Sequence, residues 1–304
     1  MKKFLCICAL VFCWNGFFSA PGAFADSHHK ESPSFSVVDL RANFHFLQGK
    51  GGNILLSTGP EGSLIIDNDY TEMYPALAAA LKPFGGTDKV RYVIDTHWHT
   101  DHTGNNVPLG GHALIISHDN VRKRLASPQD VKLLHLHAEA LPKEGLPEIT
   151  YSRSLRVHFN DHEFILTHFA HSHTDGDTVI RIPGANIIHT GDLFFNNMFP
   201  FIDLETGGNA LNYLKSVEEI LAQSTDDSII IPGHGALASK ADLARFAEML
   251  RGTFDEVRAL KAQGLSQELA QQHGLSEKWE KWGQGFIKEP VWIGIVYKSL
   301  SATS

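Results

Sequence analysis

Short apolar runs, broken by turns rich in glycine and proline, dominate the chain from Phe35 onwards and predict β-strands. Segments with apolar residues at helical spacing follow several of these runs and predict amphipathic helices. The expected strands are residues 44–47, 53–56, 63–67, 90–95, 114–116, 155–159, 163–169, 178–182 and 228–231, and the expected helices are residues 73–81, 118–125, 209–221, 240–262 and 266–272. Strand-rich halves that are each closed by helices predict an α/β protein built as a four-layer αβ/βα sandwich.

Two segments depart from this pattern. Residues 127–150 combine prolines with scattered leucines, and we expect a helical lid or an insertion there. At the N-terminus, Lys2 and Lys3 precede an apolar run over residues 4–18, and Ala23-Phe24-Ala25 supplies a small-x-small cleavage pattern. We therefore expect residues 1–25 to be a secretory signal peptide, residues 26–34 a disordered tail and residues 35–304 one folded domain with C-terminal helices. The apolar run is shorter than the about 20 residues of a bilayer span, so an uncleaved anchor is the weaker alternative.

Composition narrows the range of functions. All three cysteines, Cys6, Cys8 and Cys13, lie in the expected signal peptide, so the exported chain would have no disulfide, thiolate metal ligand or cysteine nucleophile. The formal net charge of −8 becomes −10 once Lys2 and Lys3 are removed. An acidic chain without basic runs is a poor candidate for nucleic-acid binding. We expect an exported, periplasmic protein with a small-molecule partner and no membrane attachment after cleavage.

The candidate chemistry centres on residues 97–102, which read His-Trp-His-Thr-Asp-His. In an extended segment, His97 and His99 point to the same side and can bind one metal ion together. A sharp turn after them would bring Asp101 and His102 near a second ion. Imidazole is the commonest side-chain ligand of transition metals, so four ligand-type residues within six positions predict a metal site.

This segment resembles the central motif of the metallo-β-lactamase fold superfamily. Three further elements of the family's pattern follow in order, His-Thr-Asp-Gly-Asp at 173–177, Thr-Gly-Asp at 190–192 and Pro-Gly-His-Gly at 232–235. The resemblance covers most of the chain after residue 35 and implies two metal ions on one site. The implied ligands are His97, His99 and His173 for the first ion, Asp101, His102 and His234 for the second, and Asp192 as the bridge between them.

These ligands are all imidazole or carboxylate, which suits two zinc ions and also tolerates iron or manganese. His99 stands where flavodiiron relatives have glutamate, which favours zinc over redox chemistry. Asp67 ends a predicted strand and would either support a ligand imidazole from behind or cap a turn. Four other histidines are expected not to bind metal, although one of them is a rival to His173: these are His158, His162, His168 and the rival His171.

The resemblance implies a hydrolase in which a hydroxide that bridges the two ions attacks a carbonyl or phosphoryl centre. Asp101 and Asp192 would be the catalytic carboxylates that orient this hydroxide, and Asp101 could also protonate the leaving group. No G-x-S-x-G elbow is present, so a covalent acyl-enzyme has no support. Trp98, Phe194 and Phe195 flank the ligands and are the predicted lining of a substrate pocket.

Several substrates are compatible with this chemistry. The pattern is more similar to the Asp-bridged branches that hydrolyse thioesters and lactones, such as glyoxalase II, than to zinc lactamases with a cysteine ligand. We therefore expect a small acyl substrate, namely an ester, thioester, lactone or lactam. The alternatives are a metallo-β-lactamase proper, a mono-iron sulfur dioxygenase and a non-catalytic periplasmic metal-binding protein. A nuclease is disfavoured by export and negative charge, and the oligomeric state is left open.

Overall fold

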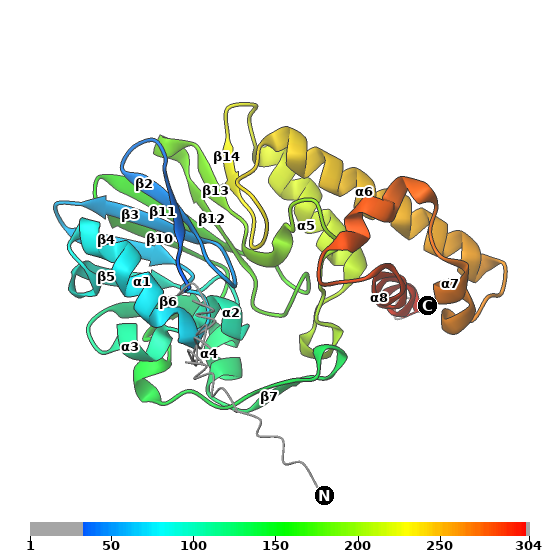
Figure 1. Cartoon of the computed structure of the whole chain (residues 1–304), viewed down its shortest axis with the longest axis horizontal. Coiled ribbons are helices and arrows are strands. Elements are labelled where there is room, and N and C mark those ends of the chain that lie inside the picture. The colour runs from blue at the N-terminus through cyan, green and yellow to red at the C-terminus, as the bar shows by residue number, and fades with distance from the viewer. Residues whose placement is uncertain (1–32, 302–304) are drawn as a thin grey trace, which may run out of the picture. The chain divides into compact units, whose positions relative to one another are not determined.

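The computed structural model describes residues 33–301 and contains two main sheets (Figure 1). The expected signal peptide and nearly all of the expected tail lie outside these residues. The first sheet has the strand order β1-β2-β3-β4-β5-β6-β9, and the second has the order β10-β11-β12-β13-β14. The strands are β1 Ser36–Asp39, β2 Phe44–Gln48, β3 Ile54–Gly59, β4 Gly62–Ile66, β5 Val90–Ile94, β6 Leu114–His118, β7 Gln129–Val131, β8 Leu136–Ala138, β9 Ile149–Tyr151, β10 Ser154–Phe159, β11 His162–His168, β12 Thr178–Ile182, β13 Ile187–His189 and β14 Ile229–Ile231.

The predicted helices are present within a few residues of their expected ends. The α-helices are α1 Tyr74–Leu81, α2 Thr100–Thr103, α3 Asn106–Gly110, α4 Asp119–Leu125, α5 Ala210–Gln223, α6 Lys240–Ala262, α7 Gln267–His273 and α8 Glu289–Ser301. Helix α8 was not predicted. Its residues Trp292, Ile293, Ile295 and Val296 are all buried, so it lacks the one-sided apolar stripe by which a surface helix is recognised. None of the described helices combines the length and the apolarity that a membrane crossing requires.

The first sheet buries both of its faces, because successive side chains of a strand point to opposite sides. In β3 and β4, Leu55 and Ile66 pack in the cluster between the two sheets. Their neighbours Leu56 and Ile65 pack instead with Leu77 of α1 and with residues of α3. Figure 1 shows α1 and α3 covering this outer face.

The second sheet repeats the pattern towards the C-terminal helices. In β13, Ile187 packs between the sheets, whereas Ile188 joins the cluster that contains residues of α5, α6 and α8. The order of layers is therefore helices, sheet, sheet, helices. This arrangement confirms the predicted αβ/βα sandwich.

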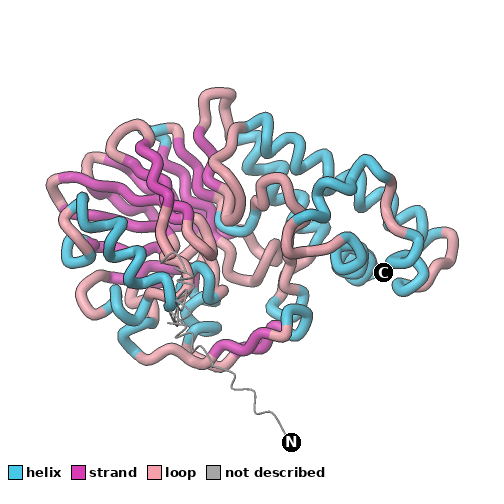
Figure 2. The backbone as a smooth tube through the Cα atoms, in the orientation of Figure 1, coloured by secondary structure: helices cyan, strands magenta, loops and turns pink. Residues whose placement is uncertain are grey.

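Of the two alternatives for residues 127–150, a helical lid or an insertion, the helical lid is wrong. Strands β7 and β8 pair antiparallel, with Val131 opposite Leu136, and form a separate two-stranded sheet (Figure 2). His135 adopts the left-handed conformation (φ 52°) at the reversal of the chain. The leucines of this segment fall in the turn of the hairpin, in β8 and in the loop after it, and the prolines lie outside the two strands, so the scattered leucines do not reflect a helical period.

Loops from both sheets converge at one edge. In the first sheet β4 and β5 are parallel, and in the second β13 and β14 are parallel, so each pair ends on one side. Asp67 follows β4, the 97–102 segment follows β5, Asp192 follows β13 and His234 follows β14. A backbone hydrogen bond from Asn53 N to Gly233 O (2.8 Å) ties the two sets of loops together. Three of the four predicted metal-binding elements thus meet at this edge, and the fourth, residues 173–177 in the loop between β11 and β12, brings His173 to the same place.

Candidate metal centre

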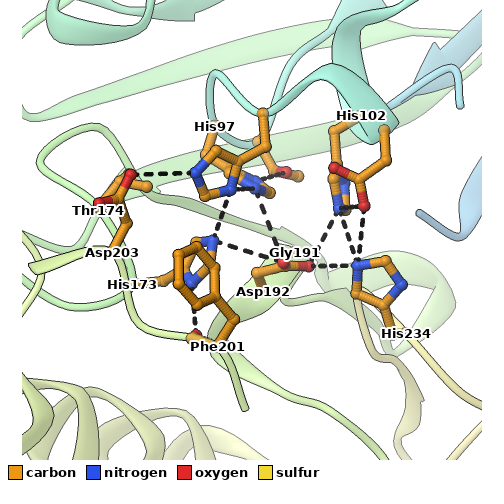
Figure 3. A network of polar contacts seen from close by, with 12 residues as sticks. His97, His102, His173, Thr174, Gly191, Asp192, Phe201, Asp203 and His234 are labelled. Atoms are coloured by element: carbon orange, nitrogen blue, oxygen red, sulfur yellow. Dashed lines mark hydrogen bonds and ion pairs between the residues drawn. The ribbon is translucent and has the colours of Figure 1, made fainter. Parts of the chain in front are cut away.

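The structure brings the seven predicted ligands together in two adjoining groups (Figure 3). Within each group, one ligand atom of every member lies within 4.8 Å of the corresponding atoms of the others. The first group consists of His97, His99, His173 and Asp192, and the second consists of Asp101, His102 and His234.

Three imidazole nitrogens define the first group. His99 Nδ1 lies 3.0 Å from His97 Nε2 and 2.9 Å from His173 Nε2. Asp192 Oδ2 lies 3.7 Å from His97 Nε2 and 3.4 Å from His173 Nε2. Three nitrogens and one carboxylate oxygen therefore surround one point.

The other oxygen of Asp192 faces the second group. Asp192 Oδ1 lies 3.1 Å from His102 Nε2 and 3.4 Å from His234 Nε2. Asp101 Oδ2 closes this group, at 3.1 Å from His234 Nε2 and 3.6 Å from His102 Nε2. One carboxylate therefore has one oxygen toward each group of ligands.

The turn that separates the two groups is built into the 97–102 segment. His99 is extended (ψ 146°), and α2 begins at the next residue. The backbone N–H of His102 donates to the carbonyl of His99 at 3.0 Å. This reversal sends His97 and His99 to one side and the side chains of Asp101 and His102 to the other.

The loop that carries His173 is organised by a buried carboxylate. Asp177 Oδ2 accepts the backbone N–H groups of His173 (2.7 Å) and Thr174 (2.9 Å), and its other oxygen accepts the Thr174 hydroxyl. Burial raises the pKa of Asp177 to about 7 in spite of these bonds. The second aspartate of the 173–177 element therefore shapes the loop and does not face the metal groups.

The far nitrogen of each imidazole in the first group is held by an oxygen. His173 Nδ1 contacts the carbonyl of Phe201 at 2.8 Å, and His99 Nε2 contacts Asp203 Oδ2 at 3.3 Å. A carbonyl and a carboxylate can only accept, so both of these nitrogens carry the proton. The lone pairs of His173 Nε2 and His99 Nδ1 are consequently directed toward the centre of the group.

Asp67 links the two groups from behind. Its Oδ2 accepts from His102 Nδ1 at 2.7 Å and from the hydroxyl of Thr96 at 2.8 Å. Because Thr96 gives its only hydroxyl proton to Asp67, His97 Nδ1 must donate to Thr96 Oγ1, from which it lies 3.0 Å. The carboxylate thereby fixes the protonation of one imidazole in each group, which is the supporting contact expected behind a metal ligand.

These contacts test whether a cation fits the site. Three imidazole lone pairs converge at about 3 Å in the first group with no proton between them, an arrangement that repels unless a positive ion lies among them. Among the described residues, Asp192 Oδ1 is buried and accepts no hydrogen bond, and the His102 and His234 nitrogens at 3.1 and 3.4 Å are its nearby polar neighbours. A carboxylate oxygen beside two imidazole nitrogens is a donor set that suits a cation. The donor set and its geometry therefore fit metal ions.

The two groups differ in charge. Burial lowers the pKa of His97 well below its usual value and that of His173 to about 4, so both imidazoles are neutral at pH 7. Burial acts in the same direction on His102 and His234, but the carboxylates around them, Asp192 above all, outweigh it. The pKa of His102 is raised well above its usual value and that of His234 to about 9. An ion at the second group must therefore displace protons at neutral pH.

Two glycines permit the close approach of the loops. A β-carbon at position 52 would lie 2.3 Å from the ring of His102, and one at position 233 would lie 2.0 Å from Asp192 Oδ1. Neither contact can be relieved without moving a predicted ligand. Gly52 and Gly233 are therefore required by the packing of the metal groups.

A cavity of about 430 Å³ opens onto the second group. Trp98 lies in its wall as predicted, together with Leu136 of the β7–β8 hairpin and the C-terminal Phe286. Phe194 and Phe195 do not line it. Both are fully buried, Phe194 against Phe246 and Phe195 stacked on the ring of His234 (centroids 5.1 Å apart), so the prediction of a lining role is corrected to a packing role.

The other histidines of residues 33–301 lie outside the two groups. The rival to His173 points away, because His171 Nδ1 contacts the carbonyl of Gly207 at 3.2 Å. His168 stacks on His118 with ring centroids 3.6 Å apart. Neither of these rings supplies an atom to the metal groups.

Two further residues at the site were missed by sequence reasoning. Asp203 holds His99, but in the sequence it is a loop aspartate whose one local signal is that it caps the 3₁₀ helix Leu204–Thr206. Tyr70 lies in the cavity wall. Burial and then the nearby Asp101 carboxylate raise the pKa of Tyr70, so its phenol stays protonated. In the sequence, the only indication that Tyr70 lies near the site was its position three residues after Asp67.

Comparison with known proteins places this geometry in context. The model of a family described as the metallo-beta-lactamase superfamily matches residues 37–234. An uncharacterized protein from Aquifex aeolicus (strain VF5) is 26% identical over 194 residues, which is 60% of this chain and 79% of that protein.

Among solved structures, a metallo-beta-lactamase from Cronobacter sakazakii aligns with a TM-score of 0.62 and 18% identity, over 77% of this chain and 98% of its own. A stereoselective inverting sec-alkylsulfatase from Pseudomonas sp. aligns with a TM-score of 0.62 and 16% identity, over 87% of this chain. This chain spans half the length of that sulfatase. At these identities the two structures show a shared fold.

Proposed function

The chain belongs to the metallo-beta-lactamase superfamily of metal-dependent hydrolases, and from this premise we propose that it is an exported dinuclear zinc hydrolase of a small acyl compound. The observation that carries the proposal is the orientation of Asp192, whose two oxygens face two separate groups of ligands. A carboxylate in this position suits a bridge between two ions. The intact set of seven ligands argues against a non-catalytic protein on the same fold.

The ligand chemistry supports zinc. His97, His99 and His173 would hold one ion and Asp101, His102 and His234 the other, with Asp192 between them. Imidazole and carboxylate ligands are those of catalytic zinc sites, and iron or manganese would accept the same set.

When bound, the ions supply Lewis acidity, which polarises a carbonyl and makes water acidic enough to attack it at neutral pH. The protein's own groups then orient the reactants. Burial raises the pKa of Asp101, but His102 and His234 outweigh burial and hold it at about 2. Asp101 is therefore a carboxylate at neutral pH. It suits orienting the attacking water, and it holds no proton for a leaving group.

Tyr70 is the neutral donor on the cavity wall. Its phenol stays protonated, and it shares the cavity with Asp101 and Trp98. We assign to Tyr70 a hydrogen bond to an oxygen of the substrate, and to the buried Trp98 the exclusion of water beside His99. Both roles require only groups that the cavity already presents.

The substrate class follows from what the chain lacks as well as from what it has. The described residues contain no cysteine, so the cysteine ligand of many zinc lactamases has no counterpart. We propose an ester, thioester or lactone as the preferred substrate, with lactams as weaker ones. The proposal of export rests on the sequence of residues 1–25, and mass determination of the N-terminus of periplasmic protein tests it.

Metal analysis combined with a substrate panel tests the function. The panel comprises nitrocefin, an acyl homoserine lactone, a glutathione thioester, a phosphodiester and a secondary alkyl sulfate, the last because of the sulfatase neighbour. Two zinc ions per chain and turnover of an acyl compound, lost in Asp101→Ala, are the expected result. One iron per chain with oxygen consumption on persulfides, or two ions without turnover of any compound, would overturn the proposal.

A further inference from the structure

The cavity at the metal centre has a neighbour. A second cavity of about 460 Å³ lies between the β7–β8 hairpin and helix α8. Val131 and Phe201 line both cavities, so these two residues form the boundary between them. Each cavity alone is large enough for a small ligand, and together they extend from the metal groups to α8.

The first cavity is polar at one end and apolar at the other. Asp101 and His234 border it at the metal groups, whereas Leu134 and Leu136 border it along the hairpin. The second cavity presents the apolar residues Leu133, Ile202 and Ile295, and its lining also includes the charged residues Lys132, Glu205 and Lys298. A ligand that matched both cavities would therefore be polar at the metal groups and apolar along the hairpin, and its far end would lie near charged side chains.

Exposed apolar side chains gather at these cavities. Leu133 is 44% exposed, Leu136 53% and Phe286 52%. Leu136 and Phe286 line the first cavity, and Leu133 lines the second. Large apolar side chains that border a concave surface mark a ligand-binding groove more often than scattered exposure does.

We propose that the substrate of this enzyme carries an extended aliphatic tail, which lies along the β7–β8 hairpin and passes Val131 into the second cavity. The reacting group lies at Asp101 and His234, so the substrate is a long-chain acyl compound and not a short one. This proposal deepens the proposed function and rests on it for the position of the reacting group. It also gives the 127–150 segment a role, because the hairpin is the common wall of both cavities.

Binding of straight-chain alkanoates tests the tail site without requiring turnover. Calorimetry on the zinc-loaded protein would compare butyrate, hexanoate, octanoate and decanoate. We expect the dissociation constant to fall by roughly threefold to fourfold for each added methylene while the tail remains in the cavities. The same series as p-nitrophenyl esters should show a parallel rise in kcat/KM.

Two exposed leucines distinguish the cavities. Leu136→Ser should weaken binding of every chain from hexanoate upwards by about threefold to tenfold. Leu133→Ser should weaken decanoate by a similar factor and leave butyrate unchanged, because only a long tail reaches the second cavity. The matched control is Leu114→Ser, since Leu114 is also 44% exposed but lines neither cavity. It should change neither series.

The failures of the two proposals are distinguishable. A dissociation constant that does not depend on chain length, or a Leu133→Ser variant that behaves like Leu114→Ser, would overturn the tail site even if esters are hydrolysed. A chain-length dependence that is sensitive to both hairpin leucines, with no turnover of any ester, would uphold the tail site and contradict the hydrolase.

Discussion

The two groups of metal ligands are separated by one carboxylate, yet they are built differently. In the first group, His97 and His173 are buried and neutral, and their far nitrogens donate to Thr96 and to the carbonyl of Phe201. In the second, the side chains of Asp101 and His234 are each 17% exposed and border the cavity of about 430 Å³. Three of the four ligands of the first group are imidazoles, whereas the second has two imidazoles beside the carboxylates of Asp101 and Asp192.

This difference in burial and charge suggests that the two groups have different tasks. The first group is preorganised, because its imidazole lone pairs already converge and because His97 and His173 hold no extra proton at neutral pH. The second group is charged before an ion binds, with His234 protonated below about pH 9 and Asp101 ionised above about pH 2. We infer that the first group binds its ion more tightly and that the second adjusts to substrate and pH.

Removal of the shared carboxylate should have the largest effect. In Asp192→Ala both groups lose a ligand oxygen, so we expect about one metal ion or fewer per chain and a fall in kcat/KM of about three orders of magnitude or more. Metal analysis and steady-state kinetics measure these two quantities. Asp175→Ala is the control, because Asp175 pairs with Arg124 at 2.8 Å and belongs to neither group. Retention of two ions in Asp192→Ala would show that Asp192 is not a bridge.

Acidification should have the second largest effect, because it should weaken metal binding at the second group more than at the first. The raised pKa values of His102 and His234 mean that an ion at the second group competes with protons below about pH 9. Its affinity should fall by at least about tenfold per pH unit, or about a hundredfold from pH 8 to pH 6. The first group should lose less, because His97 and His173 stay neutral over this range of pH. Titration with a metal chelator at both pH values would measure this, and equal losses from both groups would contradict it.

Substitutions of Asp67 and Asp203, which hold ligand imidazoles, test the difference between the two groups further. Asp67→Asn should weaken the second ion by about tenfold to a hundredfold, because Asp67 holds His102 directly and uses both oxygens as acceptors, for His102 Nδ1 and Thr96 Oγ1 on one and for the Thr96 backbone N–H on the other, whereas an amide nitrogen cannot accept. Asp203→Asn should weaken the first ion instead, since Asp203 contacts His99. Stepwise metal titration of the two variants provides the measurement. Because Asp67 also reaches His97 through Thr96, the first ion should weaken less than the second in Asp67→Asn, and an unchanged second ion would contradict this assignment.

The smallest expected effect is that of Tyr70→Phe. The substitution removes the phenol and leaves both groups of ligands in place, so the metal content should stay at two ions. We expect kcat to fall by about tenfold, which is typical of one lost hydrogen bond to a charged transition state. Unchanged kcat at full metal content would exclude Tyr70 from the reaction.

The sequence predicted the metal ligands better than it predicted the residues that support them. Ligands His97, His99, Asp101 and His102 lie within six residues, so their spacing indicated a metal site, and the resemblance of three later segments to the family's motifs implied His173, Asp192 and His234. The fold followed from apolar runs whose alternation was recognisable.

Residues that act from a distance could not be predicted in this way. Asp203 reaches His99 over 104 positions, and Phe201 holds His173 only through a backbone carbonyl, which no side-chain pattern can reveal. Phe194 and Phe195 were assigned to a pocket because they follow Asp192. Their burial depends on α6 packing behind them, which is a property of the tertiary structure.

The two glycines at the loop crossings have a consequence for mutational scanning. Gly52 and Gly233 contribute no atom to binding or proton transfer, yet any larger residue would press on His102 or on Asp192 Oδ1. In a scan scored by growth or by hydrolysis, every substitution at these positions should score as deleterious as the loss of a ligand. A scan alone would then suggest a catalytic role for two residues that matter because they have no side chain to collide with a ligand.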